Sequence, residues 1–238
     1  MQLIIFAGGL GTRISEETDY VPKPMVRIGK KPILWHIMKY YSTFGFLEFI
    51  ICGGYKIGVI KNYFKANKKK NKLCKIKVIN TGLNSNTGER LKRVKKYVSN
   101  IFCLTYGDGL CDVNINKLIN FHKKSKSTVT LTTVKPIPHF GKIFFKGNKV
   151  SKFLEKDKNT ENWINGGFFV CDKKVFQYLN KKNSIFEKEV LNVLARRGKL
   201  IAYKHSGFWS CMDTLRDKRY LNELWLSNKA PWKIWKNE

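Results

Sequence analysis

The sequence predicts an α/β fold with a mostly parallel, mixed central sheet flanked by helices. Two observations support this prediction. Short apolar segments alternate with amphipathic ones through the first half of the chain, and glycine-rich turns follow several of the apolar segments. Alternating strands and helices bury a parallel sheet between two helical layers. A chain of 238 residues is long enough to form such a core by itself.

The predicted strands of the first half are short runs rich in Ile, Val, Leu, Phe and Thr. They span residues 2–7, 48–52, 75–80, 101–106 and 128–134. The predicted helices carry apolar residues at helical spacing. They span residues 32–44, 57–65, 89–98 and 114–124. Ligands of such sheets bind beyond the carboxyl ends of the strands, so we expect the site at the loop after Ala7 and at Asp108.

The second half of the chain is richer in predicted strands. These span residues 142–145, 149–154, 163–171 and 200–205, and two helices span 184–197 and 214–225. No repeat, low-complexity tract or linker divides the chain. We therefore interpret the second half as a β-rich extension of the same sheet that contributes to substrate binding, and we predict a single domain.

The charge of the chain is strongly positive. Lys and Arg total 46 and Asp and Glu total 17, which gives a net charge of +29. A nucleic acid or an anionic membrane surface would be one explanation. We favour a lysine-rich solvated surface, because the basic residues are mostly Lys and are scattered along the chain. We therefore expect no specific nucleic acid partner, although the positive field would attract phosphorylated substrates.

Targeting signals are weak. No segment approaches the ~18 apolar residues of a membrane-spanning helix, and the apolar run at residues 3–6 is too short for a signal peptide. The six cysteines are dispersed, with no CxxC pair and no His at metal-ligand spacing. We interpret them as buried residues of a cytoplasmic protein without structural zinc, and we expect no membrane partner.

A glycine-rich loop directly follows the first predicted strand. Its residues are Ala7, Gly8, Gly9, Leu10, Gly11, Thr12 and Arg13. Glycines let the backbone approach an anion closely, and successive N–H groups can surround a phosphate. The loop is not a Walker A sequence, and Ile14 stands where a GxGxxG fingerprint needs glycine. A tight turn without a ligand is the alternative, but the nearby Arg13 and Lys23 favour phosphate.

Lys23 lies between Pro22 and Pro24. The two proline rings restrict the backbone around it. An ammonium held in this way beside a phosphate loop can neutralise charge on a group that is being transferred. A rigid turn with an exposed lysine is the alternative interpretation.

Two carboxylates are candidate metal ligands. Asp108 follows the strand predicted over residues 101–106, and Asp213 precedes the helix predicted over 214–225. Mg²⁺ is usually held by one or two carboxylates together with phosphate oxygens and water. Asp213 could also serve as the N-cap of that helix. His36, on a predicted apolar helix, and the C-terminal tryptophans are expected to pack in the core.

The run from Ala7 to Met25 resembles the sugar-1-phosphate nucleotidylyltransferases. Later segments are similar to the glucose-1-phosphate cytidylyltransferases within that superfamily; they are residues 15–18, 32–38, 52–56, 165–169, 207–217 and 230–233. The likeness covers nearly the whole chain. It implies a Rossmann-like nucleotidyltransferase fold, with a nucleotide-binding half over residues 1–134 and a sugar-phosphate-binding half with the C-terminal helix over residues 135–238.

The resemblance also implies a reaction. CTP and α-D-glucose 1-phosphate would give CDP-glucose and pyrophosphate by in-line attack assisted by Mg²⁺. The enzyme would be a homo-oligomer, and its product would feed the synthesis of dideoxysugars for surface polysaccharide such as the O-antigen of lipopolysaccharide.

The roles of the family's residues carry over where this chain matches. The glycine loop would bind the triphosphate, Arg13 the departing pyrophosphate and Lys23 the reacting phosphates. Asp108 and Asp213 would hold Mg²⁺. The other nucleotide-binding positions are Thr81, Ser85, Thr87, Gly88, Arg90 and Gly107. The sugar-phosphate positions, besides Lys23, are Glu155, Lys156, Asn165 and Gly166.

The chain departs from the family at several points. Ser85 replaces a more usual Thr, Glu89 replaces a Gly, and Asp157 replaces a Pro. The segment between Phe64 and Val78 is Lys-rich and shorter than in the family, where it contributes to subunit contacts. Three alternatives therefore stay open: a different nucleotide or sugar phosphate, a nucleotide-sugar-binding protein without turnover, and a nucleic-acid binder, which no known motif supports.

Overall fold

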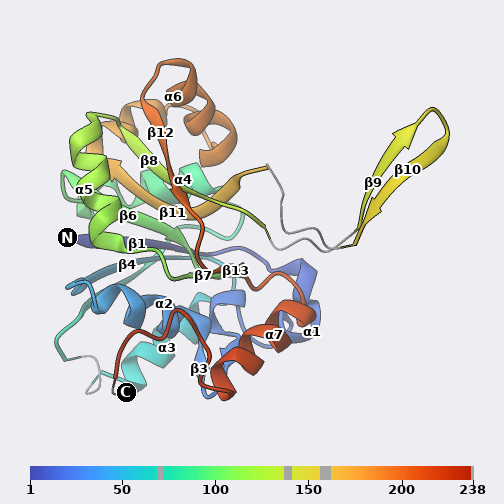
Figure 1. Cartoon of the computed structure of the whole chain (residues 1–238). Helices are drawn as coiled ribbons and strands as arrows, with labels where there is room; N and C mark the ends of the chain where they lie inside the picture. The colour runs from blue at the N-terminus through green and yellow to red at the C-terminus, as the bar shows by residue number, and fades with distance from the viewer. Residues whose placement is uncertain (69–71, 137–140, 156–161, 237–238) are drawn as a thin grey trace.

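The computed structural model describes residues 1–68, 72–136, 141–155 and 162–236. Its central sheet has seven strands (Figure 1). Their spatial order is β12 (Leu200–His205), β8 (Val129–Val134), β11 (Ile164–Asp172), β6 (Ile101–Tyr106), β1 (Gln2–Ala7), β4 (Glu48–Gly53) and β5 (Lys75–Asn80). Among the strand pairs that the structure describes in this sheet, those of β11 with β6 and β8 are antiparallel and the others are parallel. The predicted α/β class and mostly parallel sheet are confirmed.

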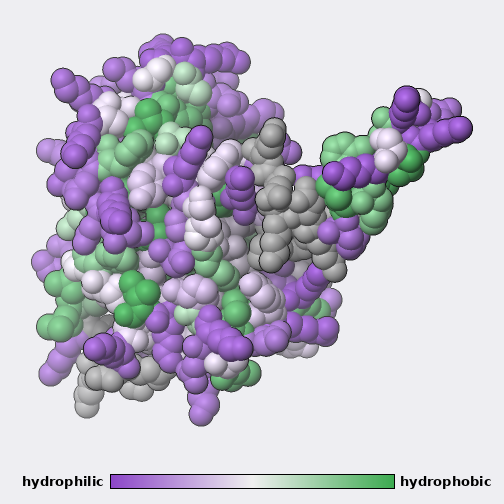
Figure 2. Space-filling view, in the orientation of Figure 1, coloured by the Kyte–Doolittle hydropathy of each residue, from purple (hydrophilic) through white to green (hydrophobic). Residues whose placement is uncertain are grey.

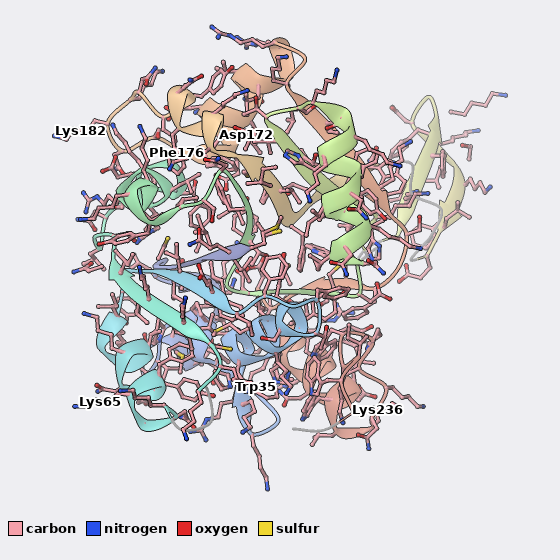
Figure 3. All side chains as sticks on the ribbon, turned by 90° about the vertical axis from the view of Figure 1, so that its left-hand side faces the viewer. Trp35, Lys65, Asp172, Phe176, Lys182 and Lys236 are labelled. Carbon is pink, nitrogen blue, oxygen red and sulfur yellow. The ribbon has the colours of Figure 1, made fainter. Side chains whose placement is uncertain are left out.

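The sheet separates two hydrophobic cores. Along β1, Leu3 and Ile5 face one core, and Ile4 and Phe6 face the other, as the alternation of side chains along a strand requires. The first core is covered by α2 (Ile33–Ser42), α3 (Ile57–Ala66), α5 (Ile115–Ser125) and α7 (Leu215–Leu226). The second is covered by α4 (Thr87–Arg93), a 3₁₀ helix (Lys173–Tyr178), a π-helix (Phe186–Leu191) and α6 (Asn192–Arg196). Figure 3 shows Trp35 and Phe176 in these opposite layers.

Two predicted helices differ from the structure. The helix expected over residues 89–98 ends at Arg93, and a 3₁₀ turn, Lys95–Tyr97, follows it. The N–H of Val94 donates to Leu91 O, three residues earlier, which tightens the helix end. The helix expected over residues 184–197 is a π-helix followed by α6. In both segments the apolar spacing marks buried positions, but it does not require one continuous α-helix.

As predicted, strands of the second half extend the same sheet, because β11 and β12 belong to it. The projecting part is a hairpin of β9 (Lys142–Lys146) and β10 (Lys149–Leu154) (Figure 1). Cross-strand pairs place four exposed apolar residues on one of its faces; these are Ile143 with Phe153 and Phe145 with Val150. Figure 2 shows this hydrophobic surface on the projecting hairpin.

Short ladders complete the fold. β7 (Gly109–Cys111) pairs antiparallel with β13 (Trp209–Cys211), and β2 (Arg27–Ile28) pairs with β3 (Lys31–Pro32). Each of these strands has two or three residues, which is too few for a periodic sequence pattern. In the part of the chain that the structure describes, no helix is both long and apolar enough to cross a bilayer.

The C-terminal segment packs its tryptophans around His36, as expected. The Trp225 and Trp232 rings both contact the imidazole. His36 Nε2 is 3.0 Å from Ile28 O, and Trp232 Nε1–H donates to His36 Nδ1 at 3.4 Å. These partners require a neutral ring that is protonated at Nε2. Burial lowers the pKa of His36 to about 4.

This buried imidazole predicts a loss of stability in mild acid. Between pH 6.5 and about 4 the unfolded chain binds a proton at His36 that the folded chain does not. The free energy of unfolding should therefore fall as the pH is lowered through this window, by about 3 kcal/mol from this group. Urea unfolding at pH 7, 6 and 5 should show a shallower pH dependence for His36→Gln than for the parent protein. Equal slopes would contradict the assignment. Burial also lowers the pKa of His122, so the contribution of His122 to the pH dependence should remain in both proteins.

Candidate active site

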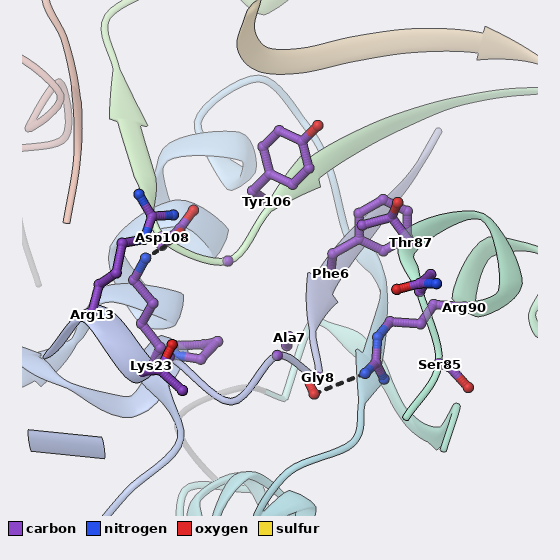
Figure 4. A pocket seen from close by; sticks show the side chains of 16 residues that line it. Phe6, Ala7, Gly8, Arg13, Lys23, Ser85, Thr87, Arg90, Tyr106 and Asp108 are labelled. Atoms are coloured by element: carbon purple, nitrogen blue, oxygen red, sulfur yellow. Dashed lines mark hydrogen bonds and ion pairs between the residues drawn. The ribbon is translucent and has the colours of Figure 1, made fainter. Parts of the chain in front are cut away.

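A cavity of about 370 Å³ opens at the carboxyl ends of β1 and β6. One side is formed by the glycine loop and Lys23, and the other by residues 85–87 and Arg90. Phe6 and residues 106–108 complete the lining. Figure 4 shows Arg13, Lys23 and Asp108 at one end of the cavity and Ser85, Thr87 and Arg90 at the other. The cavity thus lies where the sequence predicts a ligand.

Within the cavity, the Lys23 ammonium lies between two carboxylates. Its Nζ is 2.7 Å from Asp108 Oδ2, and it also pairs with Asp213 Oδ1. The Lys23 side chain is only 12% exposed. Burial lowers the pKa of Lys23, but the charges and hydrogen bonds of the two carboxylates outweigh burial, so the pKa is raised above 10.5. Lys23 therefore stays charged, and its ammonium is held in one place.

The β7–β13 ladder brings Asp213 to this cluster. Gly109 pairs with Cys211, and the N–H of Met212 donates to Asp108 O at 2.8 Å. Asp108 therefore precedes β7 and Asp213 comes two residues after β13, so both acidic residues lie at the same end of the ladder. The N-cap of α7 is Thr214, which forms a capping box with Asp217. The alternative prediction, in which Asp213 caps this helix, is wrong, and its carboxylate instead faces Lys23.

Arg13 pairs with the other oxygen of Asp213. Arg13 Nη1 is 2.9 Å from Asp213 Oδ2, and the Arg13 side chain is 73% exposed. Burial raises the pKa of Asp213, but Lys23 and Arg13 outweigh burial and hold the pKa below 3.8. Asp213 is therefore ionised at neutral pH. Arg13 can leave this exposed pair for an incoming anion at little cost, because ion pairs on the surface are weak.

The glycine loop presents free hydrogen-bond donors near the cavity. Within the described part of the chain, no group accepts a hydrogen bond from the N–H of Gly9, Leu10 or Gly11. Gly9, Gly11, Thr12 and Arg13 line the cavity, whereas Leu10 is 50% exposed and lies outside the lining. Adjacent unpaired N–H groups favour an anion such as a phosphate.

Gly107 shows how closely the strand ends approach the loop. Its N–H donates to Phe6 O at 2.9 Å, and a Cβ at this position would lie 2.7 Å from the same oxygen. A side chain here would force the β1 and β6 ends apart. The glycine therefore sets the width of the cavity between Ala7 and Asp108.

Arg90 and Thr81 are positioned by contacts within the protein. The Arg90 guanidinium donates to the Gly8, Gly82 and Leu83 carbonyls at 2.8 to 3.1 Å, and to Thr81 Oγ1 at 2.9 Å. Thr81 is fully buried, and its hydroxyl donates to Gly53 O. Arg90 lines the cavity and Thr81 does not. Both residues hold together the loops that follow β1, β4 and β5.

Ser85, Thr87 and Gly88 are close in sequence but differ in their surroundings. Ser85 and Thr87 line the cavity. Gly88 is buried against the loop that precedes the π-helix, because its N–H donates to Ser184 O at 2.9 Å. A ligand in the cavity can thus reach two of these three positions.

Glu187 was not predicted from the sequence, and it joins two residues that line the cavity, Thr87 and Tyr106. It lies in the π-helix, a rare geometry that is frequent at functional sites. Thr87 Oγ1 donates to Glu187 Oε2 at 2.6 Å, and Tyr106 OH donates to Oε1 at 2.5 Å. Asn165 Nδ2 then donates to Tyr106 OH at 3.2 Å. One carboxylate thus couples the segment around Thr87 to β11.

The predicted sugar-phosphate positions are not gathered in this cavity. Asn165 is exposed on β11, and the carbonyl of Gly166 accepts a hydrogen bond from Trp209 Nε1 at 2.7 Å. Glu155 directly follows β10 at the base of the hairpin. Lys156 lies outside the described residues. Of this set, Lys23 lines the cavity, and Asn165 is linked to it through Tyr106.

The donor set at Asp108 and Asp213 fits a hard divalent cation. The two side chains are 26% and 23% exposed, and both offer carboxylate oxygens at one place. A lysine ammonium already lies between them, which shows that the space attracts positive charge. Asp108 lines the cavity, and Asp213 lies beside it across Lys23. One or two carboxylates next to bound phosphates are the ligands with which Mg²⁺ is usually held.

Comparison with known proteins agrees with this geometry. A family model described as nucleotidyl transferase matches residues 2–219. A glucose-1-phosphate cytidylyltransferase of Salmonella typhimurium is 46% identical, over 99% of this chain and 100% of its own length. A probable glucose-1-phosphate cytidylyltransferase of Bacillus subtilis is 39% identical over the same shares. The alignment with the Salmonella protein spans 256 positions, more than the 238 residues of this chain, so the relative has residues without a counterpart here.

A solved structure supports the fold independently. A putative glucose-1-phosphate thymidylyltransferase from Bacillus anthracis superposes with a TM-score of 0.76, covering 100% of this chain and 98% of its own, at 19% sequence identity. The family match, the full-length similarity and the shared fold lead to one conclusion. The chain belongs to the nucleotidyl transferase family, and within it to the group of the glucose-1-phosphate cytidylyltransferases.

Proposed function

We propose that this enzyme transfers a cytidylyl group from CTP to α-D-glucose 1-phosphate, giving CDP-glucose and pyrophosphate. The observation that carries the proposal is the cavity itself. It joins unpaired N–H groups of a glycine loop to a fixed ammonium and a carboxylate, in a chain 46% identical over its full length to a glucose-1-phosphate cytidylyltransferase.

The triphosphate would lie along the glycine loop. The N–H groups of Gly9 and Gly11 would donate to phosphate oxygens, and exposed Arg13 would exchange Asp213 for the β- and γ-phosphates. An oxygen of the sugar phosphate attacks the α-phosphorus as the bond from that phosphorus to the bridging oxygen of pyrophosphate breaks. The pyrophosphate leaves with the electron pair of that bond. Such a reaction asks mainly for positioning and for neutralisation of charge.

Lys23 would act on the reacting phosphates. Its ammonium is already positioned by two carboxylates, so little reorganisation is needed to place it beside the α-phosphate. Asp108 and Asp213 would hold Mg²⁺, which when bound would neutralise phosphate charge and orient the phosphate oxygens. The same two carboxylates would then keep both Lys23 and the metal beside one phosphate.

The remaining positions divide between the two ends of the cavity. Ser85 and Thr87 would contact the nucleoside, while Thr81, Gly88 and Arg90 would act by fixing the surrounding loops. Asn165 would contact the sugar phosphate together with Gly166, and Glu155 would reach it from the base of the hairpin. Lys156 remains a proposed contact of the sugar phosphate from its sequence position alone. Glu187 would set the relative positions of Thr87 and Asn165 through Tyr106.

The first test is pyrophosphate release with Mg²⁺, using each nucleoside triphosphate in turn with α-D-glucose 1-phosphate. Release with CTP alone is the expected result. Release with another triphosphate would overturn the base assignment and keep the mechanism. No release with any of them, repeated with a panel of other sugar 1-phosphates, would indicate a binding protein without turnover.

The carboxylates provide the second test. Asp108→Asn and Asp213→Asn should each lower kcat by about 10²- to 10³-fold, because each removes a carboxylate that would hold Lys23 and the metal beside the reacting phosphates. Asp19→Asn makes the same change at an exposed acid outside the cavity and should leave kcat unchanged. Circular dichroism spectra should match for all three variants. Parent-like rates for the two site variants at saturating Mg²⁺ would remove the carboxylates from the mechanism.

We further propose that the protein is a cytoplasmic homo-oligomer folded as one domain. All six cysteines are unpaired, which suits a reducing compartment, and strands from both halves share one sheet. The apolar face of the projecting hairpin is the surface that a second copy would cover.

Light scattering tests the association. The parent protein should have a mass above 27.7 kDa, and Phe145→Asp should lower it, because Phe145 is 66% exposed on the hairpin face. Leu226→Asp, at a residue 74% exposed on α7, is the matched control and should keep the parent mass. A monomeric parent, or equal effects of both variants, would reject the hairpin as the interface.

A further inference from the structure

Three metal-ligating side chains meet beside the candidate active site. Cys111 is the last residue of β7, Asp112 follows it, and His205 is the last residue of β12. The ligand atoms of these side chains, a sulfur, a carboxylate oxygen and a ring nitrogen, all lie within 4.8 Å of one another. Among the described residues, these three are the His, Cys, Asp or Glu side chains that lie close enough together, in a group of at least three, to bind one ion.

The fold holds two of these ligands together already. His205 Nε2 is 2.8 Å from Asp112 Oδ1, and the N–H of Asp112 donates to Phe208 O at 3.2 Å. Gly207 passes directly over the pair, since a Cβ on it would lie 2.4 Å from Asp112 Oδ1. The end of β12 is thereby fixed against β7, and the position of the imidazole is determined by the backbone around it.

The surroundings of the Cys111 sulfur suit a metal-bound thiolate. The thiol is buried, and burial raises its pKa, while hydrogen bonding to the backbone of Val113 acts in the opposite direction. A backbone donor of this kind stabilises negative charge on sulfur. A metal ion removes the thiol proton outright when it binds, so a high pKa in its absence is no obstacle.

The geometry requires only small movements. Zinc binds sulfur, nitrogen and oxygen ligands at about 2.0 to 2.3 Å, so ligands of a tetrahedral site lie roughly 3.5 Å apart. The side chains of His205 and Asp112 are 13% and 32% exposed, which leaves an entry path and space for a water as fourth ligand. A sulfur ligand disfavours Mg²⁺, so this cluster differs in chemistry from the pair Asp108 and Asp213.

We propose that Cys111, Asp112 and His205 bind one divalent ion of the zinc class, with water as the fourth ligand. The ion would join the carboxyl end of β12 to the β7–β13 ladder, which carries Asp108 and Asp213. Its binding would therefore stabilise the segment that aligns the two carboxylates. The site does not depend on the identity of the nucleotide or the sugar.

The test uses the full chain, freed of metal by a chelator and then titrated with Zn²⁺ or Co²⁺ without nucleotide. We expect one equivalent of Zn²⁺ to bind by equilibrium dialysis and to raise the melting temperature. Bound Co²⁺ should give a near-ultraviolet charge-transfer band from sulfur to metal. Cys111→Ser should abolish this band, and His205→Gln should weaken binding at least tenfold.

Control variants keep the proposal falsifiable. Cys74→Ser changes a thiol that is distant from the cluster in the sequence and half-buried, and it should bind like the parent. Loss of the band in Cys211→Ser instead of Cys111→Ser would place the ion at Asp213, which Cys211 contacts, and would overturn the proposal. Equal Zn²⁺ binding by parent, Cys111→Ser and His205→Gln would also overturn it, and would identify the Asp112–His205 contact as a simple hydrogen bond between two segments.

Discussion

The contact of the Lys23 ammonium with Asp108 and Asp213 is the interaction on which the candidate site depends. A largely buried charge costs several kcal/mol unless it is paired, and Lys23 is only 12% exposed. The ammonium therefore needs both carboxylates, and the fold must bring them together from distant parts of the sequence. The short β7–β13 ladder does so. The nucleotide-binding half and the C-terminal part of the chain are thereby joined at the point where the proposed chemistry takes place.

Arg90 is a second buried cation, and it is stabilised differently. Its guanidinium donates to backbone carbonyls and to one hydroxyl. Within the described residues, no carboxylate forms an ion pair with it. Carbonyl dipoles satisfy its hydrogen bonds without cancelling its charge. The cavity therefore has a cation compensated by carboxylates at one end and an uncompensated cation at the other, and the uncompensated charge adds to the positive field that attracts an anionic ligand to the cavity.

Most strands and the glycine loop could be predicted from the sequence, because buried runs and glycines follow local rules. The site could be predicted only in part. Asp108 and Asp213 were recognised through their family motifs, but the ladder that joins them is too short to give a pattern. Glu187 was missed because its partners Thr87 and Tyr106 are distant in sequence and the π-helix has no distinct periodicity. The Cys111, Asp112 and His205 cluster was missed for the same reason, since spacing rules detect only ligands that are close in sequence.

Among the described strands, β5 and β12 lie at the two ends of the seven-stranded sheet, and each has one edge without a partner strand. Lys75 and Lys77 are exposed on β5, and Lys204 is exposed on β12. A strand of another molecule would have to come within about 4.8 Å to pair with such an edge, whereas like charges repel over about 8 Å at physiological ionic strength. Two copies meeting edge to edge would therefore be driven apart before their backbones could bond. Part of the lysine excess thus protects the sheet against fibrous aggregation, and the protein should be most prone to aggregate in concentrated salt, where this protection is screened.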